Sequence, residues 1–297
     1  MRTIAGRRAG AWFVVLAAAC WSVLGIIGRM AFDSGIGPQT LVFSRVLVAV
    51  LLLGSGLLLL RPRTLRLQGR DLKILLPLGA IVAINYSTFY QSVLQLGVSV
   101  SIAVFYVFPA MTAVAAWAFL SEHVGPRTAF ALTIAVAGCA LVSGLLETEV
   151  QISALGVAFA LISAASYAAY AVLVRRAVRE RPPTWVLFYS LLFALPGLCV
   201  ATLLVGEPLL PPFGEGWLYV GAVAVVPTLA GYALYAHGLR RVAAARAAIL
   251  ATMEPVLATV WAVVFFAERL SAWQAAGFAL VLISAWIAQR KRGASAQ

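Results

Sequence analysis

Ten apolar runs, each of about 18 to 24 residues, follow one another along the chain, separated by short segments with charges, glycine or proline. In lipid only helices and closed barrels satisfy every backbone polar group, and runs of this length exceed a typical strand. The chain is 63% hydrophobic and 11% charged, whereas soluble domains are about half apolar and a quarter charged. We therefore predict an all-α polytopic membrane protein whose ten transmembrane helices cover approximately residues 10–31, 38–60, 72–95, 99–120, 126–145, 153–175, 184–206, 217–239, 244–266 and 272–289.

Charged residues divide between alternate loops. The termini and one set of loops carry Arg2, Arg7, Arg8, Arg61, Arg63, Arg66, Arg70, Lys73, Arg127, Arg175, Arg176, Arg179, Arg181, Arg240, Arg241, Arg246, Arg290, Lys291 and Arg292. The other loops carry Asp33, Glu147, Glu149, Glu207 and Glu215, with Arg29 and Arg269 as basic exceptions. Because loops rich in arginine and lysine stay on the inner side, we expect both termini in the cytoplasm and a multi-pass protein of a bacterial-type inner membrane.

Other partners find no support in the sequence. The net charge of +12 is spread over short clusters without a basic face or a nucleic-acid-binding motif, so we expect no nucleic acid. Cys20, Cys139 and Cys199 all lie inside apolar runs, without the spacing of a disulfide framework or a metal site. We therefore expect neither a metal nor another cofactor.

The chain repeats itself at an offset of 146 positions. Matching pairs include Arg29 with Arg175, Tyr86 with Tyr232, Pro109 with Pro255 and Glu122 with Glu268, and the breaks between helices coincide as well. Each half holds an odd number of helices, so the second half enters the membrane from the opposite side, and the charge bias of matching loops is reversed. This pattern predicts two inverted five-helix repeats, residues 1–147 and 148–297, with a substrate site near the midplane between them. Such a pair is sufficient as a monomer, and a dimer stays open.

Glu254 and Pro255 stand near the middle of the apolar run Ala244–Phe266. A carboxylate inside hydrocarbon costs on the order of 3 kcal/mol and a proline removes a helical hydrogen bond, so both residues suggest a functional position. Pro109 is the mate of Pro255, but Phe108 occupies the position equivalent to Glu254. We expect Pro109, Pro227 and Pro255 to act as hinges, and Glu254 either to contact the substrate or to cap the broken backbone.

Each half of the chain resembles an EamA domain of the drug/metabolite transporter superfamily. The resemblance rests on Trp21, on Tyr86 through Leu96 and Ser101 through Pro109, and in the second half on the segment Tyr232–Leu239, on Ala243–Ala248, and on Glu254-Pro255 followed by Glu268. It covers nearly the whole chain. It implies a ten-helix transporter of small metabolites, commonly an exporter, with the fourth and ninth helices lining a central cavity. Because Phe108 departs from the pattern, a mechanism with two symmetric carboxylates is not implied here.

Aromatic residues away from the membrane interfaces form the candidate substrate site. Trp21 and its mate Tyr167, and Tyr86 and its mate Tyr232, lie near the centres of four predicted helices, and Tyr170, Tyr235 and Tyr90 lie one helical turn from three of them. We predict that they bind substrate together with Asn85, Tyr106 and Glu254. The alternative for the aromatic residues is simple helix packing, and for polar residues such as Asn85 it is hydrogen bonding between helices.

Several further residues receive structural interpretations. Arg45 either snorkels to the outer surface or pairs with a buried acceptor. Glu122 and its mate Glu268 are interpreted as structural charges at helix ends. Gly125-Pro126 opens the fifth helix, and Ser271 with Gln274 is predicted to form a capping box that opens the tenth.

These observations favour a secondary transporter that works by alternating access. An aromatic, weakly charged site suits export of neutral or aromatic amino acids, with multidrug or lipophilic-cation efflux as the alternative. A membrane-embedded enzyme is disfavoured, because the sequence contains no His-Glu-x-x-His, phosphate-binding glycine loop or nucleophile elbow. A channel is the remaining alternative, although the sequence shows no carbonyl filter motif or ring of like charges.

Overall fold

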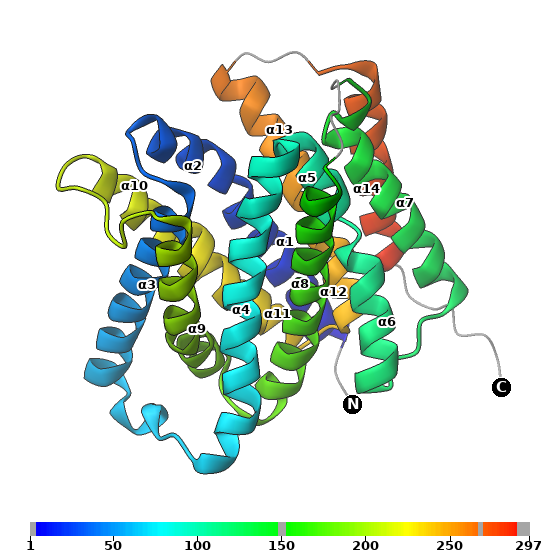
Figure 1. The fold of residues 1–297 in the computed structure, drawn as a ribbon. Helices are drawn as coiled ribbons and strands as arrows, with labels where there is room; N and C mark the ends of the chain where they lie inside the picture. The colour runs from blue at the N-terminus through cyan, green and yellow to red at the C-terminus, as the bar shows by residue number, and fades with distance from the viewer. Residues whose placement is uncertain (1–3, 148–152, 267–269, 290–297) are drawn as a thin grey trace.

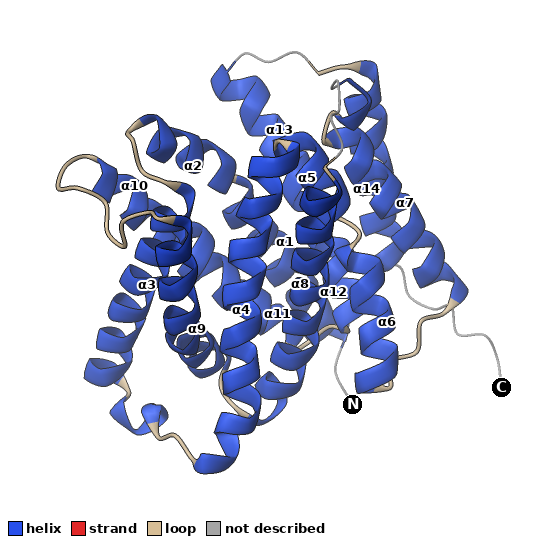
Figure 2. Cartoon of the chain, in the orientation of Figure 1, coloured by secondary structure: helices blue, strands red, loops and turns tan. Residues whose placement is uncertain are grey.

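The computed structural model describes residues 4–147, 153–266 and 270–289, and within them every regular element is a helix (Figure 2). The elements are α1 Ile4–Ser22, α2 Leu24–Asp33, α3 Pro38–Leu60, η1 Pro62–Leu65, α4 Gly69–Leu96, α5 Val98–Phe105, α6 Phe108–Leu120, α7 Pro126–Val142, η2 Leu145–Glu147, α8 Ala154–Glu180, α9 Pro183–Val205, α10 Gly216–Val223, the π-helix η3 Ala224–Gly231, α11 Tyr232–Leu239, α12 Ala244–Ala251, α13 Met253–Phe266 and α14 Ala272–Gln289.

Within the described residues, nine helical stretches are long and apolar enough to cross a bilayer. The tenth predicted span corresponds to α7, which is apolar but has only 17 residues. The largest differences from the expected boundaries are at α1, which begins at Ile4, six residues before the predicted start, and at α8, which continues five residues beyond Arg175 to Glu180. The apolar runs of the sequence therefore correspond to a polytopic helical bundle.

Several of the spans are interrupted helices. One span is divided into α5 and α6 around Tyr106, and another into α12 and α13 at Thr252. Pro109 has no N–H to donate to the carbonyl of Phe105, the residue at which α5 ends, and Pro255 bears the same relation to Ala251 at the end of α12. The two breaks are 146 positions apart, the offset found in the sequence.

Helices α4, α8 and α9 pack together in the middle of the bundle, whereas α7 and α14 form a close pair on one flank (Figure 1). The α7–α14 contact depends on two glycines. A Cβ at Gly277 would lie 2.6 Å from the carbonyl oxygen of Gly138, and a Cβ at Gly138 would lie 3.0 Å from that of Gly277. Only residues without side chains allow the two backbones to approach this closely.

Both predicted helix starts are present. Gly125 is the N-cap of α7, with Pro126 in the first turn, where a proline loses no intrahelical hydrogen bond. Before α14, the backbone N–H of Ser271 donates to Oε1 of Gln274 at 3.2 Å, and the N–H of Gln274 donates to Oγ of Ser271 at 3.1 Å. The predicted capping box is therefore confirmed.

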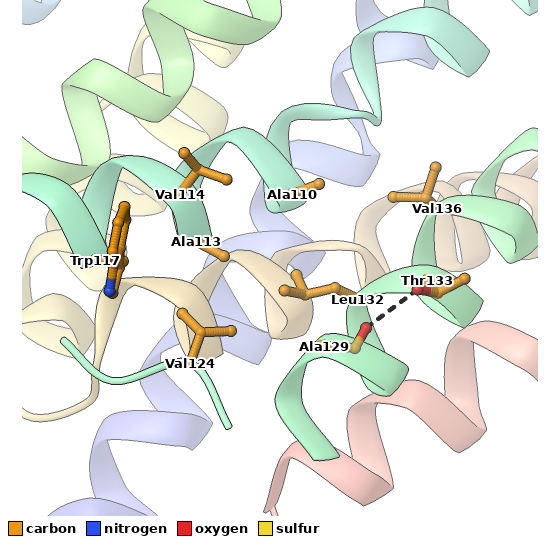
Figure 3. Close-up of a pocket in the computed structure, with 9 residues that line it drawn as sticks. All are labelled: Ala110, Ala113, Val114, Trp117, Val124, Ala129, Leu132, Thr133 and Val136. Carbon is orange, nitrogen blue, oxygen red and sulfur yellow. Dashed lines mark hydrogen bonds between the residues drawn. The ribbon is translucent and has the colours of Figure 1, made fainter. Parts of the chain in front are cut away.

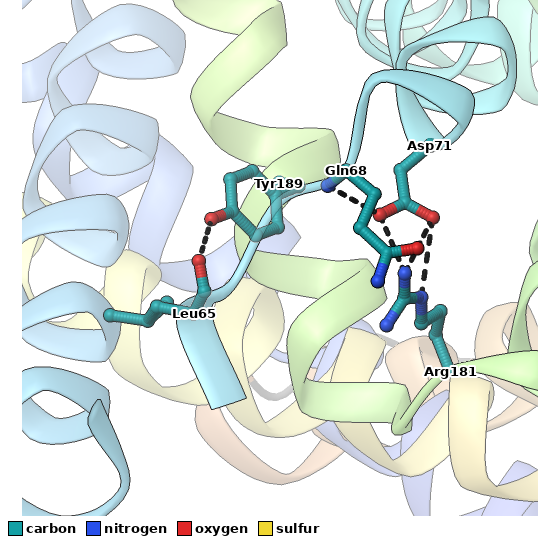
Figure 4. A network of polar contacts seen from close by, with 5 residues as sticks. All are labelled: Leu65, Gln68, Asp71, Arg181 and Tyr189. Carbon is teal, nitrogen blue, oxygen red and sulfur yellow. Dashed lines mark hydrogen bonds and ion pairs between the residues drawn. The ribbon is translucent and has the colours of Figure 1, made fainter. Parts of the chain in front are cut away.

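One end of the bundle is held by a polar network around Asp71, in the first turn of α4 (Figure 4). Arg181, directly after α8, donates from Nη2 to both carboxylate oxygens of Asp71, at 2.7 and 2.9 Å. The backbone N–H of Gln68 donates to the same carboxylate at 2.9 Å, and the Tyr189 hydroxyl of α9 donates to the carbonyl of Leu65 at 2.7 Å. These contacts connect the loop before α4 to α8 and α9.

Candidate functional site

The site begins at the indole of Trp21, which α1 directs at the π-helix η3. Its Nε1–H donates to the backbone carbonyl of Pro227 at 3.0 Å, in a buried contact. Pro227 cannot supply the α-helical donor to the carbonyl of Val223, and the π-helical register and the Thr228 hydroxyl, which donates to that carbonyl at 2.8 Å, compensate for it. The π-helix around Pro227 therefore keeps its backbone satisfied inside the bundle and fixes the Trp21 ring.

Gly231 makes room for this ring. A Cβ at Gly231 would lie 2.6 Å from Nε1 and 2.8 Å from Cδ1 of Trp21, closer than such atoms approach. The last residue of η3 therefore has to be a glycine for the indole to reach Pro227.

Around Trp21, seven of the predicted aromatic residues and two phenylalanines that were not predicted as site residues, Phe105 and Phe108, form a continuous group. We call it the aromatic cluster: Trp21, Tyr86, Phe105, Tyr106, Phe108, Tyr167, Tyr170, Tyr232 and Tyr235. The ring centroid of Trp21 lies 5.1 Å from that of Tyr232 and 6.2 Å from that of its sequence mate Tyr167. The other mated pair, Tyr86 and Tyr232, meets edge to face at 6.1 Å. The mates therefore meet in space, although each pair is 146 positions apart in the sequence.

Several hydroxyls of the cluster are buried and make only loose contacts with one another. Those of Tyr86, Tyr167 and Tyr235 make no close hydrogen bond within the part of the chain that the structure describes, although Tyr86 interacts with Tyr232 and Tyr167 with Tyr235. Buried polar groups in proteins are nearly always hydrogen-bonded, and in the membrane interior water is not generally available to bond them. Three such hydroxyls in one group favour a site for a polar solute over packing alone.

Glu254 borders the cluster from the first turn of α13. It is half-buried, and its carboxyl group lies beside the Tyr106 hydroxyl and near Cys139 and Tyr167. A carboxylate is favourable in the first turn of a helix because the exposed N–H groups give that end a partial positive charge. The equivalent position in the first half is Phe108, which is 2% exposed and packs on Tyr167 at 4.4 Å.

Arg45 of α3 belongs to this region, although the sequence did not place it in the site. It is only 3% exposed, so the predicted snorkelling to the surface is wrong. Its guanidinium carbon lies 4.5 Å from the centre of the Tyr86 ring, and its Nε has no hydrogen-bond partner among the described residues. The available signal was the arginine itself, because a cation inside an apolar run has to find something to contact.

Two predicted site residues lie in other surroundings. The amide of Asn85 donates to the carbonyl of Ser163 at 2.8 Å and to its hydroxyl at 3.1 Å, and so joins α4 to α8. Tyr90 is half-buried and meets Phe32 and Phe89 at 6.3 and 6.0 Å. Sequence reasoning missed Trp261, whose Nε1–H donates to the hydroxyl of Ser22, beside the break between α1 and α2.

A separate groove of about 640 Å³ lies between α6 and α7, away from the aromatic cluster (Figure 3). Its lining is almost entirely apolar: Ala110, Ala113, Val114, Trp117, Val124, Ala129, Leu132, Thr133 and Val136. Val114 and Trp117 are about two-thirds exposed, so the groove opens onto the outside of the bundle, where the side chains suit hydrocarbon. It offers no charged group for a polar solute.

Among the described residues, no group of three or more His, Cys, Asp or Glu side chains is placed to hold a metal ion. Glu268, the predicted mate of Glu122, lies outside the described residues. Glu122 itself accepts a hydrogen bond from the backbone N–H of Ala244 at 2.8 Å, which caps the start of α12. This contact agrees with a structural charge at a helix end.

Comparisons with known proteins agree on one family. The model of the EamA-like transporter family matches residues 8–144 and 154–289. An uncharacterized transporter of Archaeoglobus fulgidus is 29% identical over 82% of this chain and 86% of its own length. The uncharacterized transporter YwfM of Bacillus subtilis is 28% identical over 91% and 90%. A solved crystal structure has the same fold, with a TM-score of 0.80 and 20% identity over 95% of this chain and 96% of that chain.

Proposed function

Because this chain belongs to the EamA-like transporter family, a multi-pass membrane transporter is its established class, and we propose that it is a secondary transporter of neutral and aromatic amino acids. The observation that carries the proposal is the aromatic cluster, with its buried hydroxyls that make no close hydrogen bond and with Glu254 at its border. Aromatic faces bind an apolar or aromatic side chain, and the hydroxyls and carboxylate bind the polar groups of the same solute.

Glu254 is the proposed contact for the substrate ammonium. The solute ammonium and the Glu254 carboxylate both lose water on burial, and their contact with each other compensates for that loss. The Tyr106 hydroxyl lies beside the Glu254 carboxyl group and can hydrogen-bond it in either its protonated or its ionised form. Rings of the cluster also attract a cation through their faces. We propose net export across a bacterial-type inner membrane, with both termini in the cytoplasm.

Alternating access is the proposed mechanism, with two inverted five-helix repeats moving against each other. The helix breaks before Pro109 and Pro255 leave short joints near the cluster, and the π-helix at Pro227 provides a third. Residues near such breaks absorb changes in backbone angle without loss of helical hydrogen bonds elsewhere. We propose these three prolines as the hinges.

A competition assay in proteoliposomes tests the substrate. Unlabelled neutral and aromatic amino acids are expected to inhibit uptake of labelled L-phenylalanine, and Glu254→Gln is expected to lower that uptake at least tenfold. Glu215→Gln is the matched control, because Glu215 lies exposed in the loop before α10. Transport of tetraphenylphosphonium without any amino-acid transport favours lipophilic-cation efflux, the alternative function. An imposed pH gradient that leaves uptake unchanged identifies facilitated diffusion, and an accelerated uptake identifies proton coupling.

A further inference from the structure

We propose that Arg45 binds the carboxylate of the transported solute, together with the hydroxyls of Tyr86 and Tyr232. The proposal rests on the proposed function and adds to it a second charged contact, so that the site takes zwitterions in preference to amines. Arg45 is buried inside α3, and no group of the described chain explains why a cation is retained there.

No carboxylate within the described ranges is recorded as an ion-pair partner of this arginine. The ion pairs between described residues are Arg175 with Glu122 and Arg181 with Asp71, so neither involves Arg45. Its Nε is buried without an acceptor. An isolated buried cation is costly, and proteins normally supply a partner or a ligand for it.

The contact with Tyr86 does not occupy the hydrogen-bond donors of Arg45. The guanidinium carbon lies 4.5 Å from the ring centre, and an aromatic ring attracts the charge through its face without accepting a conventional hydrogen bond. The planar fork of donors matches the two oxygens of a carboxylate. The hydroxyls of Tyr86 and Tyr232, which interact with each other and both interact electrostatically with Arg45, add hydroxyl donors near it.

A second charge of opposite sign borders the same cluster. Arg45 contacts it through Tyr86, and Glu254 through Tyr106. Ring contacts connect these two tyrosines by way of Tyr232, Trp21, Tyr167 and Phe108.

Each charge is also an exception to the internal repeat. At the offset of 146, Arg45 corresponds to Leu191 and Glu254 corresponds to Phe108, and both of these apolar residues are at most 2% exposed. At the equivalent positions of the other half, a large apolar side chain is therefore sufficient for packing. One half contributes the cation and the other the carboxylate.

The test measures binding of three probes that share a phenyl ring: L-phenylalanine, phenethylamine, which lacks the carboxylate, and 3-phenylpropionate, which lacks the ammonium. Affinities are measured with purified wild-type protein, Arg45→Gln, Arg45→Lys and Glu254→Gln in detergent. We expect Arg45→Gln to weaken binding of L-phenylalanine and 3-phenylpropionate at least tenfold and to leave phenethylamine unchanged. Glu254→Gln should give the reverse pattern for the two single-charge probes, and Arg45→Lys should partly restore carboxylate binding.

If Arg45 has only a structural role, Arg45→Gln distorts the site and weakens the binding of all three probes equally. Equal losses, or unchanged 3-phenylpropionate binding, overturn the proposal. Arg45→Lys keeps the test usable where Arg45→Gln does not fold, because an ammonium retains the charge without the planar fork. Failure of wild-type protein to bind L-phenylalanine counts against the amino-acid function alone, and 3-phenylpropionate then decides whether Arg45 binds a carboxylate.

Discussion

Arg175 and Glu122 form an ion pair in which Nε lies 3.0 Å from Oε1, with side chains only 7% and 13% exposed. Arg175 also donates through Nη1 to the backbone carbonyl of Leu239 at the end of α11. With the contact from Glu122 to Ala244, these bonds join the segments around α6, α8, α11 and α12 at one end of the bundle. The pair therefore connects the two halves of the chain.

Removing one charge of this pair should destabilise the protein strongly. Glu122→Gln removes a buried carboxylate that accepts from both Arg175 and the N–H of Ala244, and we expect a loss of about 3 to 5 kcal/mol in unfolding free energy. Unfolding of the purified protein in detergent micelles measures the change. Asp71→Asn is the matched control, because its partner Arg181 is 25% exposed and we expect a loss of about 1 kcal/mol there. Equal losses of unfolding free energy in the two variants would contradict the prediction that the more buried Arg175–Glu122 pair contributes more to stability.

The close approach of Trp21 to η3 predicts the effect of adding one carbon at Gly231. Gly231→Ala places a Cβ against the indole and should break the Trp21–Pro227 hydrogen bond, with transport reduced at least fivefold and a changed tryptophan emission spectrum. Gly221→Ala in α10 is the control, because a Cβ there meets nothing within 4 Å. Similar activity in the two variants would show that the fixed position of Trp21 is not required.

The hydroxyl of Thr228 replaces the donor that Pro227 lacks. Thr228→Val keeps the shape of the side chain but removes the buried hydroxyl bond to the carbonyl of Val223, so we expect a loss of about 1 kcal/mol in unfolding free energy. Thr133→Val in α7 removes a comparable bond at an exposed position and should change stability by less than about 0.5 kcal/mol. Denaturant titration in micelles compares them, and an unchanged Thr228→Val protein would rule out this role.

The joint before Pro109 should matter for movement more than for binding. Pro109→Ala restores an N–H that can donate to the carbonyl of Phe105 and so favours a continuous helix through α5 and α6. We expect the transport rate to fall severalfold while L-phenylalanine affinity changes by less than about twofold. Pro126→Ala at the start of α7 is the control, because a proline there replaces no helical bond. A Pro109→Ala rate equal to that of wild type would argue against the hinge.

The sequence predicted the features that depend on a local pattern. Hydropathy gave the positions of the spans, and Ser271 with Gln274 predicted a cap that the structure contains. The offset of 146 also paired Trp21 with Tyr167 and Tyr86 with Tyr232, and both pairs are in contact. These successes follow from the strict length, capping and repeat rules of helices in a membrane.

Features that depend on which faces meet could not be predicted in the same way. Asn85 faces Ser163 and Arg45 faces Tyr86 because of the rotation of α4 and α3, which hydropathy does not specify. The same limit explains why Trp261 was missed, since its partner Ser22 is 239 positions away. The π-helix at Pro227 was predicted only as a bend, because its stabilising bond to Trp21 comes from another helix.

Counterflow in proteoliposomes tests the central claim most directly. Vesicles loaded with unlabelled L-phenylalanine are diluted into a trace of labelled L-phenylalanine, and internal label is followed with time. A carrier that alternates between two sides should accumulate label transiently above its equilibrium level, and Glu254→Gln should abolish this overshoot. Label that rises only to equilibrium, with a rate that does not saturate, would identify a channel. No entry of label at all would contradict the amino-acid function.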